Sequence, residues 1–212
     1  MKKMDKLKNK IKSYYKNNKK SFYLLLLIAI IGFIAGTIFI CYLSENDQIT
    51  VKNYMDSFLN DIKNNKLNYL DCFKNILISN LFFIIFSWIL GMSIIGIPIN
   101  IISYFIKSFI LGFSLSAFIL KYKTLGILYS ICYIFPHHII NFIIYTIIML
   151  YSINLSGILC YSIFNKKELN FKTIINKYFK ILIISIILII ISALIETYFT
   201  PFIFSKLFLF IK

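Results

Sequence analysis

The sequence predicts an all-α protein that crosses a membrane several times, and its composition and charge distribution are the main reasons. Hydrophobic residues make up 59% of the 212 residues and charged residues only 15%, whereas a soluble domain carries about a quarter charged residues. The charges gather between long apolar runs instead of alternating with them. This pattern excludes an ordinary soluble domain and a disordered chain.

Five apolar runs are long enough to cross a bilayer, whose hydrocarbon core of about 30 Å needs roughly 20 helical residues. They cover residues 21–43, 76–96, 99–120, 138–164 and 181–199. The first has no small-residue cleavage site and is expected to remain as an anchor. It contains Gly32 and Gly36, a spacing that favours close helix packing. We therefore expect a single transmembrane domain over residues 21–212.

The first twenty residues hold nine lysines and one aspartate, with Leu7 and Ile11 at helical spacing. This predicts a basic cytoplasmic amphipathic segment over residues 1–20, which either binds anionic lipid or serves only as a topology signal. The lysines of the chain stand beside apolar runs and not among aromatic residues on a folded face. We therefore expect the lipid bilayer, and no nucleic acid, as a partner.

The polar segment 44–74 is expected to form an extracytoplasmic amphipathic helix with Thr50 as its N-cap. Apolar residues then recur at i, i+3, i+4, i+7 and i+11, which places them on one helix face. A face of this kind docks a partner helix or lies on lipid. The alternative is a stripe folded onto the protein's own bundle. The candidate partner-binding residues, which follow Val51, are Tyr54, Met55, Phe58 and Ile62.

Two places are expected to interrupt the helices. Gly91, Gly96 and Pro98 predict a turn or a broken helix, packed inside the bundle or placed between two spans. Residues 124–164 carry no formal charge and would form a helix of about 60 Å, twice the bilayer core. We expect Pro136 to divide them into a short non-spanning helix and a span that begins near His138. The alternative is two spans.

Positive-inside counting favours five spans over six. Five spans place residues 1–20, with net charge +8, and residues 165–180, with net charge +4, in the cytoplasm. The C-terminus and segment 44–74 are then extracytoplasmic. Five spans place Lys121 and Lys123 outside the cytoplasm, against the positive-inside rule. Six spans would place residues 165–180, with net charge +4, outside, which is a larger violation.

Glu196 and Lys107 are the charged residues that fall within the expected spans. Intramembrane charges are costly and usually have a partner. Five spans bring Glu196 to the same side as His137 and His138, so a Glu–His contact is feasible; an interfacial position for Glu196 is the alternative. We expect Lys107 to snorkel. Adjacent histidines do not point the same way on a helix, so we predict no metal site, no cofactor and no catalytic residue.

Three motifs, in this order and spacing, resemble the family of stage II sporulation protein M. The second is Phe135-Pro136-His137, and the third runs from Ala193 through Glu196 to Pro201. Ser108 departs from the family pattern, which has glycine there. The first motif, between Trp88 and Phe113, includes Gly91, Gly96, Pro98, Lys107 and Gly112.

The resemblance implies a non-catalytic membrane scaffold of the sporulation engulfment machinery. Members of this family recruit and stabilise peptidoglycan-degrading partners, the sporulation proteins D and P, at the septal membrane of the mother cell. Homo-oligomerisation is left open. A small transporter or channel that uses residues 91–98 and Glu196 is the alternative function. An intramembrane enzyme built on His137, His138 and Glu196 is a third.

Overall fold

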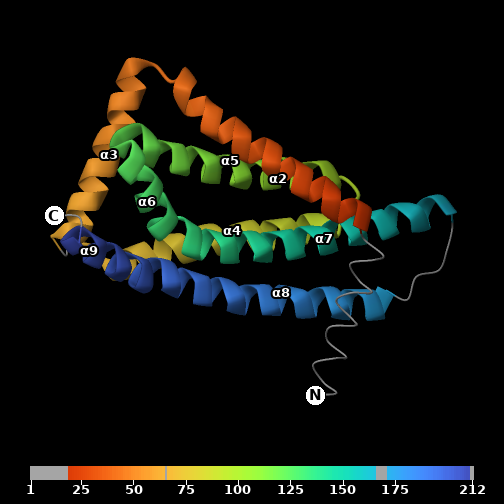
Figure 1. Cartoon of the computed structure of the whole chain (residues 1–212). Coiled ribbons are helices and arrows are strands. Elements are labelled where there is room, and N and C mark those ends of the chain that lie inside the picture. Colours follow the sequence, from red (N-terminus) through yellow and green to blue (C-terminus); the bar gives the residue numbers. More distant parts are fainter. Residues whose placement is uncertain (1–18, 65, 166–170, 211–212) are drawn as a thin grey trace.

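A computed structural model of the chain describes residues 19–64, 66–165 and 171–210 (Figure 1). Within these ranges the regular elements are helices and no strand is present, which confirms the all-α prediction. Residues 1–18 of the expected basic segment and residues 166–170 of the expected cytoplasmic segment lie outside the described residues.

Five helical segments of the described chain are long and apolar enough to span a membrane, which confirms a polytopic membrane fold. The first four begin and end close to the expected limits, although the second starts seven residues earlier. They are α2 (Lys19–Phe39, continued by the 3₁₀ turn η1, Ile40–Tyr42), α4 (Tyr69–Gly91), α5 (Gly96–Tyr122) and α7 (Phe135–Asn165). The fifth consists of α8 (Phe171–Leu194), the π-helical turn η2 (Ile195–Phe199) and α9 (Thr200–Phe210).

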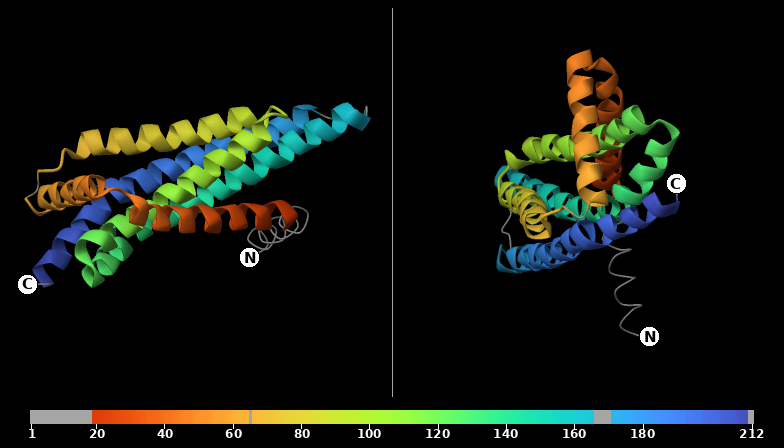
Figure 2. Two further views of the ribbon diagram at one scale, coloured as in Figure 1. Left: turned by 90° about the horizontal axis from the view of Figure 1, so that it is seen from above. Right: turned by 90° about the vertical axis from the view of Figure 1, so that its left-hand side faces the viewer.

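The spanning helices lie roughly along one direction, with α2 and α5 on one side and α4, α7 and α8 on the other (Figures 1 and 2). At one end, α3 (Glu45–Lys63) crosses the bundle between α2 and α9, beside the short helix α6 (Thr124–Tyr133). We call this the α3 end. The opposite end contains the connection between α4 and α5, and we call it the turn end.

Helices α2 and α5 pack with their backbones in direct contact. A Cβ atom added to Gly36 would overlap the carbonyl of Phe109, and one added to Gly112 would overlap the carbonyl of Phe33. Small residues are what allow two membrane helices to approach this closely. The Gly32–Gly36 pair noted in the sequence therefore marks a real helix contact, with Gly112 as its counterpart on α5.

The expected interruption at residues 91–98 is a turn between two spans. Helix α4 ends at Gly91, and α5 begins at Gly96. Pro98 lies in the first turn of α5, where its missing N–H removes no helical hydrogen bond. A Cβ on Gly96 would overlap the carbonyl of Leu90, which explains why glycine stands there. The break is therefore at the end of the bundle and not within a span.

Hydroxyl groups of α7 and α8 satisfy carbonyls at the end of α4. Ser152 Oγ donates to the Ser87 carbonyl at 2.9 Å, and Ser156 Oγ lies 3.0 Å from the Gly91 carbonyl. Tyr178 Oη donates to the Trp88 carbonyl at 2.9 Å. The last four carbonyls of a helix have no partner within it, so the bonds to Trp88 and Gly91 cap α4. All three bonds fix α7 and α8 against it.

Helix α3 starts six residues before the expected position. Ser44 is its N-cap, and Ser44 Oγ accepts a hydrogen bond of 3.2 Å from the backbone N–H of Asp47. The prediction of Thr50 as N-cap was wrong, because the Thr50 hydroxyl instead donates to the Asn46 carbonyl inside the helix. The polar residues between these positions belong to the first turns, where acids are favourable.

Pro136 and Pro201 have different effects on the helices that contain them. Helix α6 ends at Tyr133 and Pro136 lies in the first turn of α7, which confirms the short non-spanning helix. The expected end of the last span near Pro201 was wrong, because the helix continues through α9. The Thr200 N–H bonds to the Ile195 carbonyl five residues back, and this wider turn accommodates a residue without an N–H.

Candidate functional site

Polar side chains are buried along the centre of the bundle, while the outer faces are apolar. A polar group in a membrane bundle needs a partner within the protein, since lipid offers none. The candidate site lies where two partly buried charged residues, Lys107 and Glu196, meet this set. The buried polar residues include Asn80, Asn100, His137, Asn141, Ser152, Ser156, Ser192, Thr197 and Thr200.

His137 and Glu196 form a contact inside the bundle. His137 Nε2 lies 3.4 Å from Glu196 Oε1, and the two side chains are 2% and 16% exposed. His137 comes from the first turn of α7, and Glu196 comes from the π-helical turn η2. The Glu–His contact that the sequence made feasible is present, and the π-turn places the carboxylate opposite the imidazole.

Lys107 of α5 joins this cluster from the other side. Its Nζ lies 5.2 Å from the ring centroid of Phe83 and 5.5 Å from that of Tyr145, both cation–π distances. Its positive charge attracts the Glu196 carboxylate and repels a protonated His138. The expectation that Lys107 snorkels was wrong, because the aromatic rings of α4 and α7 hold the amine inside.

Further hydrogen bonds join α4, α5 and α7 around the cluster. Tyr145 Oη of α7 donates to Asn80 Oδ1 of α4, and the hydroxyls of Tyr104 and Thr146 lie 2.7 Å apart across α5 and α7. Interhelical hydrogen bonds in membrane proteins contribute on the order of 0.6 kcal/mol each. Several such bonds together, more than any single one, determine which face each helix turns toward its neighbours.

Two buried acceptors beside the contact between Glu196 and His137 have no hydrogen-bond partner among the described residues. His137 Nδ1 and Asn141 Oδ1 lie one helical turn apart on α7. A carboxylate beside an imidazole can hold and exchange a proton, and the two acceptors can take further hydrogen bonds. No group of three metal-ligating side chains occurs in the part of the chain that the structure describes.

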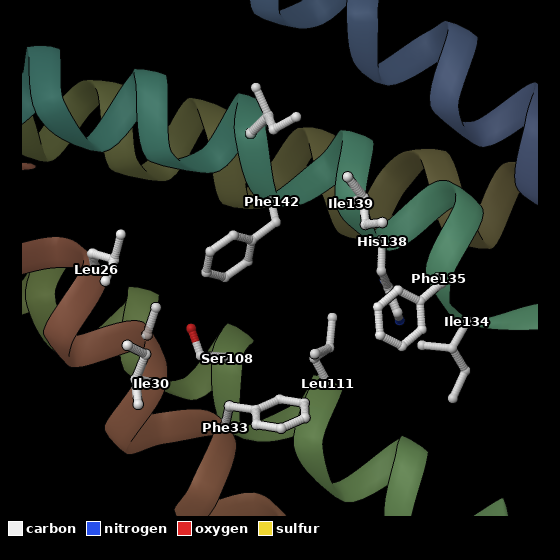
Figure 3. A pocket seen from close by; sticks show the side chains of 12 residues that line it. Leu26, Ile30, Phe33, Ser108, Leu111, Ile134, Phe135, His138, Ile139 and Phe142 are labelled. Carbon is white, nitrogen blue, oxygen red and sulfur yellow. The ribbon is translucent and has the colours of Figure 1, made fainter. Parts of the chain in front are cut away.

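His138 points toward a cavity of about 360 Å³ between α2, α5 and α7 (Figure 3). Ser108 is the other polar residue that lines it, and Ser108 Oγ donates to the Tyr104 carbonyl of its own helix. The cavity therefore presents a hydrocarbon-like surface and does not favour water or ions. The apolar lining includes Leu26, Ile30, Phe33, Leu111, Ile134, Phe135, Ile139 and Phe142.

The apolar stripe of α3 faces the protein's own bundle. Ile62 is buried, and Met55 and Phe58 pack against a cluster that contains Phe118, Tyr129 and Phe204. Tyr54 differs, because it is 70% exposed. The alternative that the sequence left open, a stripe folded onto the bundle, therefore describes Met55, Phe58 and Ile62. Of the four residues, Tyr54 alone has an exposed side chain.

An ion pair that the sequence did not suggest holds α3 in place. Lys121 Nζ and Tyr122 Oη both donate to the Asp56 carboxylate, the latter at 2.8 Å. The hydrogen bond from Lys121, followed by the one from Tyr122, lowers the pKa of Asp56 below its usual value. The sequence offered one indication of this ion pair: Asp56 stands beside the apolar stripe of α3, and Lys121 stands at the end of a span.

The fold and the buried cluster define a polytopic helical membrane protein whose spans are joined by an internal Glu–His–Lys cluster. The chain belongs to the family described as stage II sporulation protein M, whose model matches residues 24–201. The match includes Lys107, His137, Glu196 and Pro201, which confirms the resemblance seen in the motifs. The chain is thus a sporulation-related membrane protein of a family not known as catalytic.

Comparison with curated proteins and with solved structures gave no match.

Proposed function

We propose that the protein is a non-catalytic scaffold of the sporulation engulfment machinery. It recruits and stabilises the sporulation proteins D and P, which degrade peptidoglycan, at the septal and engulfing membrane of the mother cell. The match to the stage II sporulation protein M family over residues 24–201 is the observation that carries this proposal. The N-terminus is cytoplasmic and the C-terminus extracytoplasmic in this proposal.

The α3 end supplies the surface for such partners. Tyr54, in the middle of α3, is 70% exposed, and Tyr42, in the turn that precedes α3, is 82% exposed. Aromatic side chains with a polar tip are frequent anchors in protein interfaces. Because the other stripe residues hold α3 on the bundle, Tyr54 is presented from a fixed position, which lowers the entropy lost on binding.

Copurification from sporulating cells tests the proposal. The wild-type chain is expected to recover the sporulation proteins D and P, and Tyr54→Asp is expected to lower their recovery at unchanged membrane insertion. Asn60→Asp adds the same charge on an exposed position of α3 and serves as the matched control. Failure of the wild-type chain to recover either partner contradicts the scaffold function.

A small transporter is the competing function, and the contact between Glu196 and His137 inside the bundle favours it. Saturable uptake into liposomes that is lost in Glu196→Gln would establish this function in place of the scaffold. An intramembrane enzyme, the third function, requires that His137→Ala abolish activity while partner binding stays intact.

A further inference from the structure

A hollow of about 390 Å³ lies at the turn end, between the starts of α2 and α5 and the second half of α7. A neighbouring contact places the hollow at the level of the α4–α5 turn. Ser156, next to Gly157 on α7, has its Oγ 2.8 Å from the Ser93 carbonyl in that turn. Both α2 and α5 begin their spanning segments here. The hollow is therefore at the level where a bilayer changes from hydrocarbon to headgroups.

The lining combines polar groups with open space. Ser21, Asn154 and Tyr161 contribute hydroxyl and amide groups, beside aliphatic side chains of α5 and α7. Gly157 adds the space, because a Cβ atom built there has no heavy atom within 4 Å. Other glycines of the bundle, such as Gly36, are instead pressed against a neighbouring backbone. Close packing thus explains Gly36 but does not explain Gly157.

The charge around this hollow is positive. Lys19 and Lys20 immediately precede Ser21, and α8 carries Lys172, Lys177 and Lys180 at the same end. The acids of the described residues are elsewhere, on α3, at the start of α4 and in η2. They are Glu45, Asp47, Asp56, Asp61, Asp71 and Glu196.

We propose that this hollow binds the headgroup of an anionic phospholipid, such as phosphatidylglycerol. The phosphate accepts a hydrogen bond from the Ser21 hydroxyl and pairs with Lys20 and with Lys19, whose amine leaves the Tyr23 ring that it covers at 5.6 Å in the structure. A basic pocket between spanning helices is a common site for acidic lipid heads. The lipid chains remain in the surrounding bilayer, along the exposed apolar faces of α2 and α7. This inference is independent of the scaffold function.

Lipid-dependent thermal stability of the full chain in detergent tests this proposal. Phosphatidylglycerol is expected to raise Tm in a saturable manner, because a ligand that binds only the folded state stabilises it. Phosphatidylcholine with the same chains is the zwitterionic comparison. Equal shifts with both lipids would show that the headgroup is not recognised and would overturn the proposal. A shift with inorganic phosphate alone would assign the hollow to a soluble anion and overturn the lipid as ligand.

Two sets of variants separate the hollow from general surface charge. Gly157→Leu fills the hollow and is expected to abolish the shift specific to phosphatidylglycerol. Lys19→Gln with Lys20→Gln is expected to weaken binding about 30-fold, from roughly 1 kcal/mol for each lysine. Lys172→Gln with Lys180→Gln removes the same charge on α8 and is expected to retain most of the affinity.

A preference for phosphatidylglycerol that survives Gly157→Leu would attribute binding to the lysine surface and overturn the site. If Gly157→Leu does not fold, the two lysine pairs decide the question. An equal loss of affinity in both pairs overturns the site, whereas a loss confined to Lys19 and Lys20 supports it.

Discussion

Glu196 faces His137 where neither side chain has bulk water as an alternative partner. Replacing Glu196 with alanine leaves His137 Nε2 buried without its acceptor, which typically costs about 1–3 kcal/mol. Glu196→Gln keeps a carbonyl oxygen at this place and is expected to cost less. Equilibrium unfolding in mixed detergent micelles measures both, and a loss of stability in Glu196→Ala no larger than in Glu196→Gln contradicts this role of the contact.

Asp56 makes the docking of α3 dependent on pH. The hydrogen bonds from Lys121 and Tyr122 lower the pKa of this carboxyl in the folded protein, so the folded state binds its proton less tightly than the unfolded state. The resulting stability is complete above the unfolded pKa of about 4 and is lost as pH falls through the lower folded pKa. The protection of α3 amides against hydrogen exchange, measured relative to the intrinsic exchange rate at each pH, is expected to fall below about pH 4.

The matched variant for this prediction is Asp56→Asn, which removes the titrating group and keeps the side-chain shape. It is expected to show faster exchange of α3 already at neutral pH and a weaker change on acidification. An Asp56→Asn chain with the same acid-induced loss of protection as the wild type would show that another group controls the docking.

The close contact of α2 and α5 depends on glycine at specific positions. Gly36→Ala places a methyl group on the carbonyl of Phe109, and Gly112→Ala places one on the carbonyl of Phe33. Since backbone cannot yield as a side chain can, each variant is expected to lose about 1–3 kcal/mol of stability. Gly157→Ala meets open space and is expected to be neutral or stabilising by up to about 1 kcal/mol. Similar losses in all three variants would contradict this explanation.

Sequence patterns predicted those helices whose limits depend on neighbouring residues in the chain. Run length located the spans, and the excess length of residues 124–164 located the short helix before Pro136. The surface that covers the α3 stripe was not predictable, because periodicity shows that a face is apolar but not what contacts it. The continuation through Pro201 was not predictable either, since that expectation assumed a regular α-helical hydrogen-bond pattern and the structure has a π-turn.

The candidate site was partly predictable in the same sense. Glu196 and His137 were conspicuous because charges are rare in membrane spans, and a common side of the membrane brought them together. The position of Lys107 required the structure, because Phe83 and Tyr145 come from two other helices. The charge count could not distinguish an amine that reaches the interface from one held by aromatic rings.

At the scale of the molecule, the arrangement of helices predicts a definite membrane topology. Helix α6 has ten residues and would extend about 15 Å, half of the bilayer core. It therefore cannot serve as a sixth span, and α7 alone carries the chain from the α3 end to the turn end. From the positive charge at the turn end, we therefore predict that this end is cytoplasmic.

Reporter fusions at Lys123 and Lys172 test this topology directly. These positions lie at opposite ends of the bundle, separated by α7. Alkaline phosphatase, which folds outside the cytoplasm, is expected to be active after Lys123 and inactive after Lys172. A fluorescent protein that matures only in the cytoplasm is expected to give the inverse result, which controls for expression. Phosphatase activity at both positions would mean that residues 124–164 cross the membrane twice, and both the five-span topology and the cytoplasmic turn end would then be wrong.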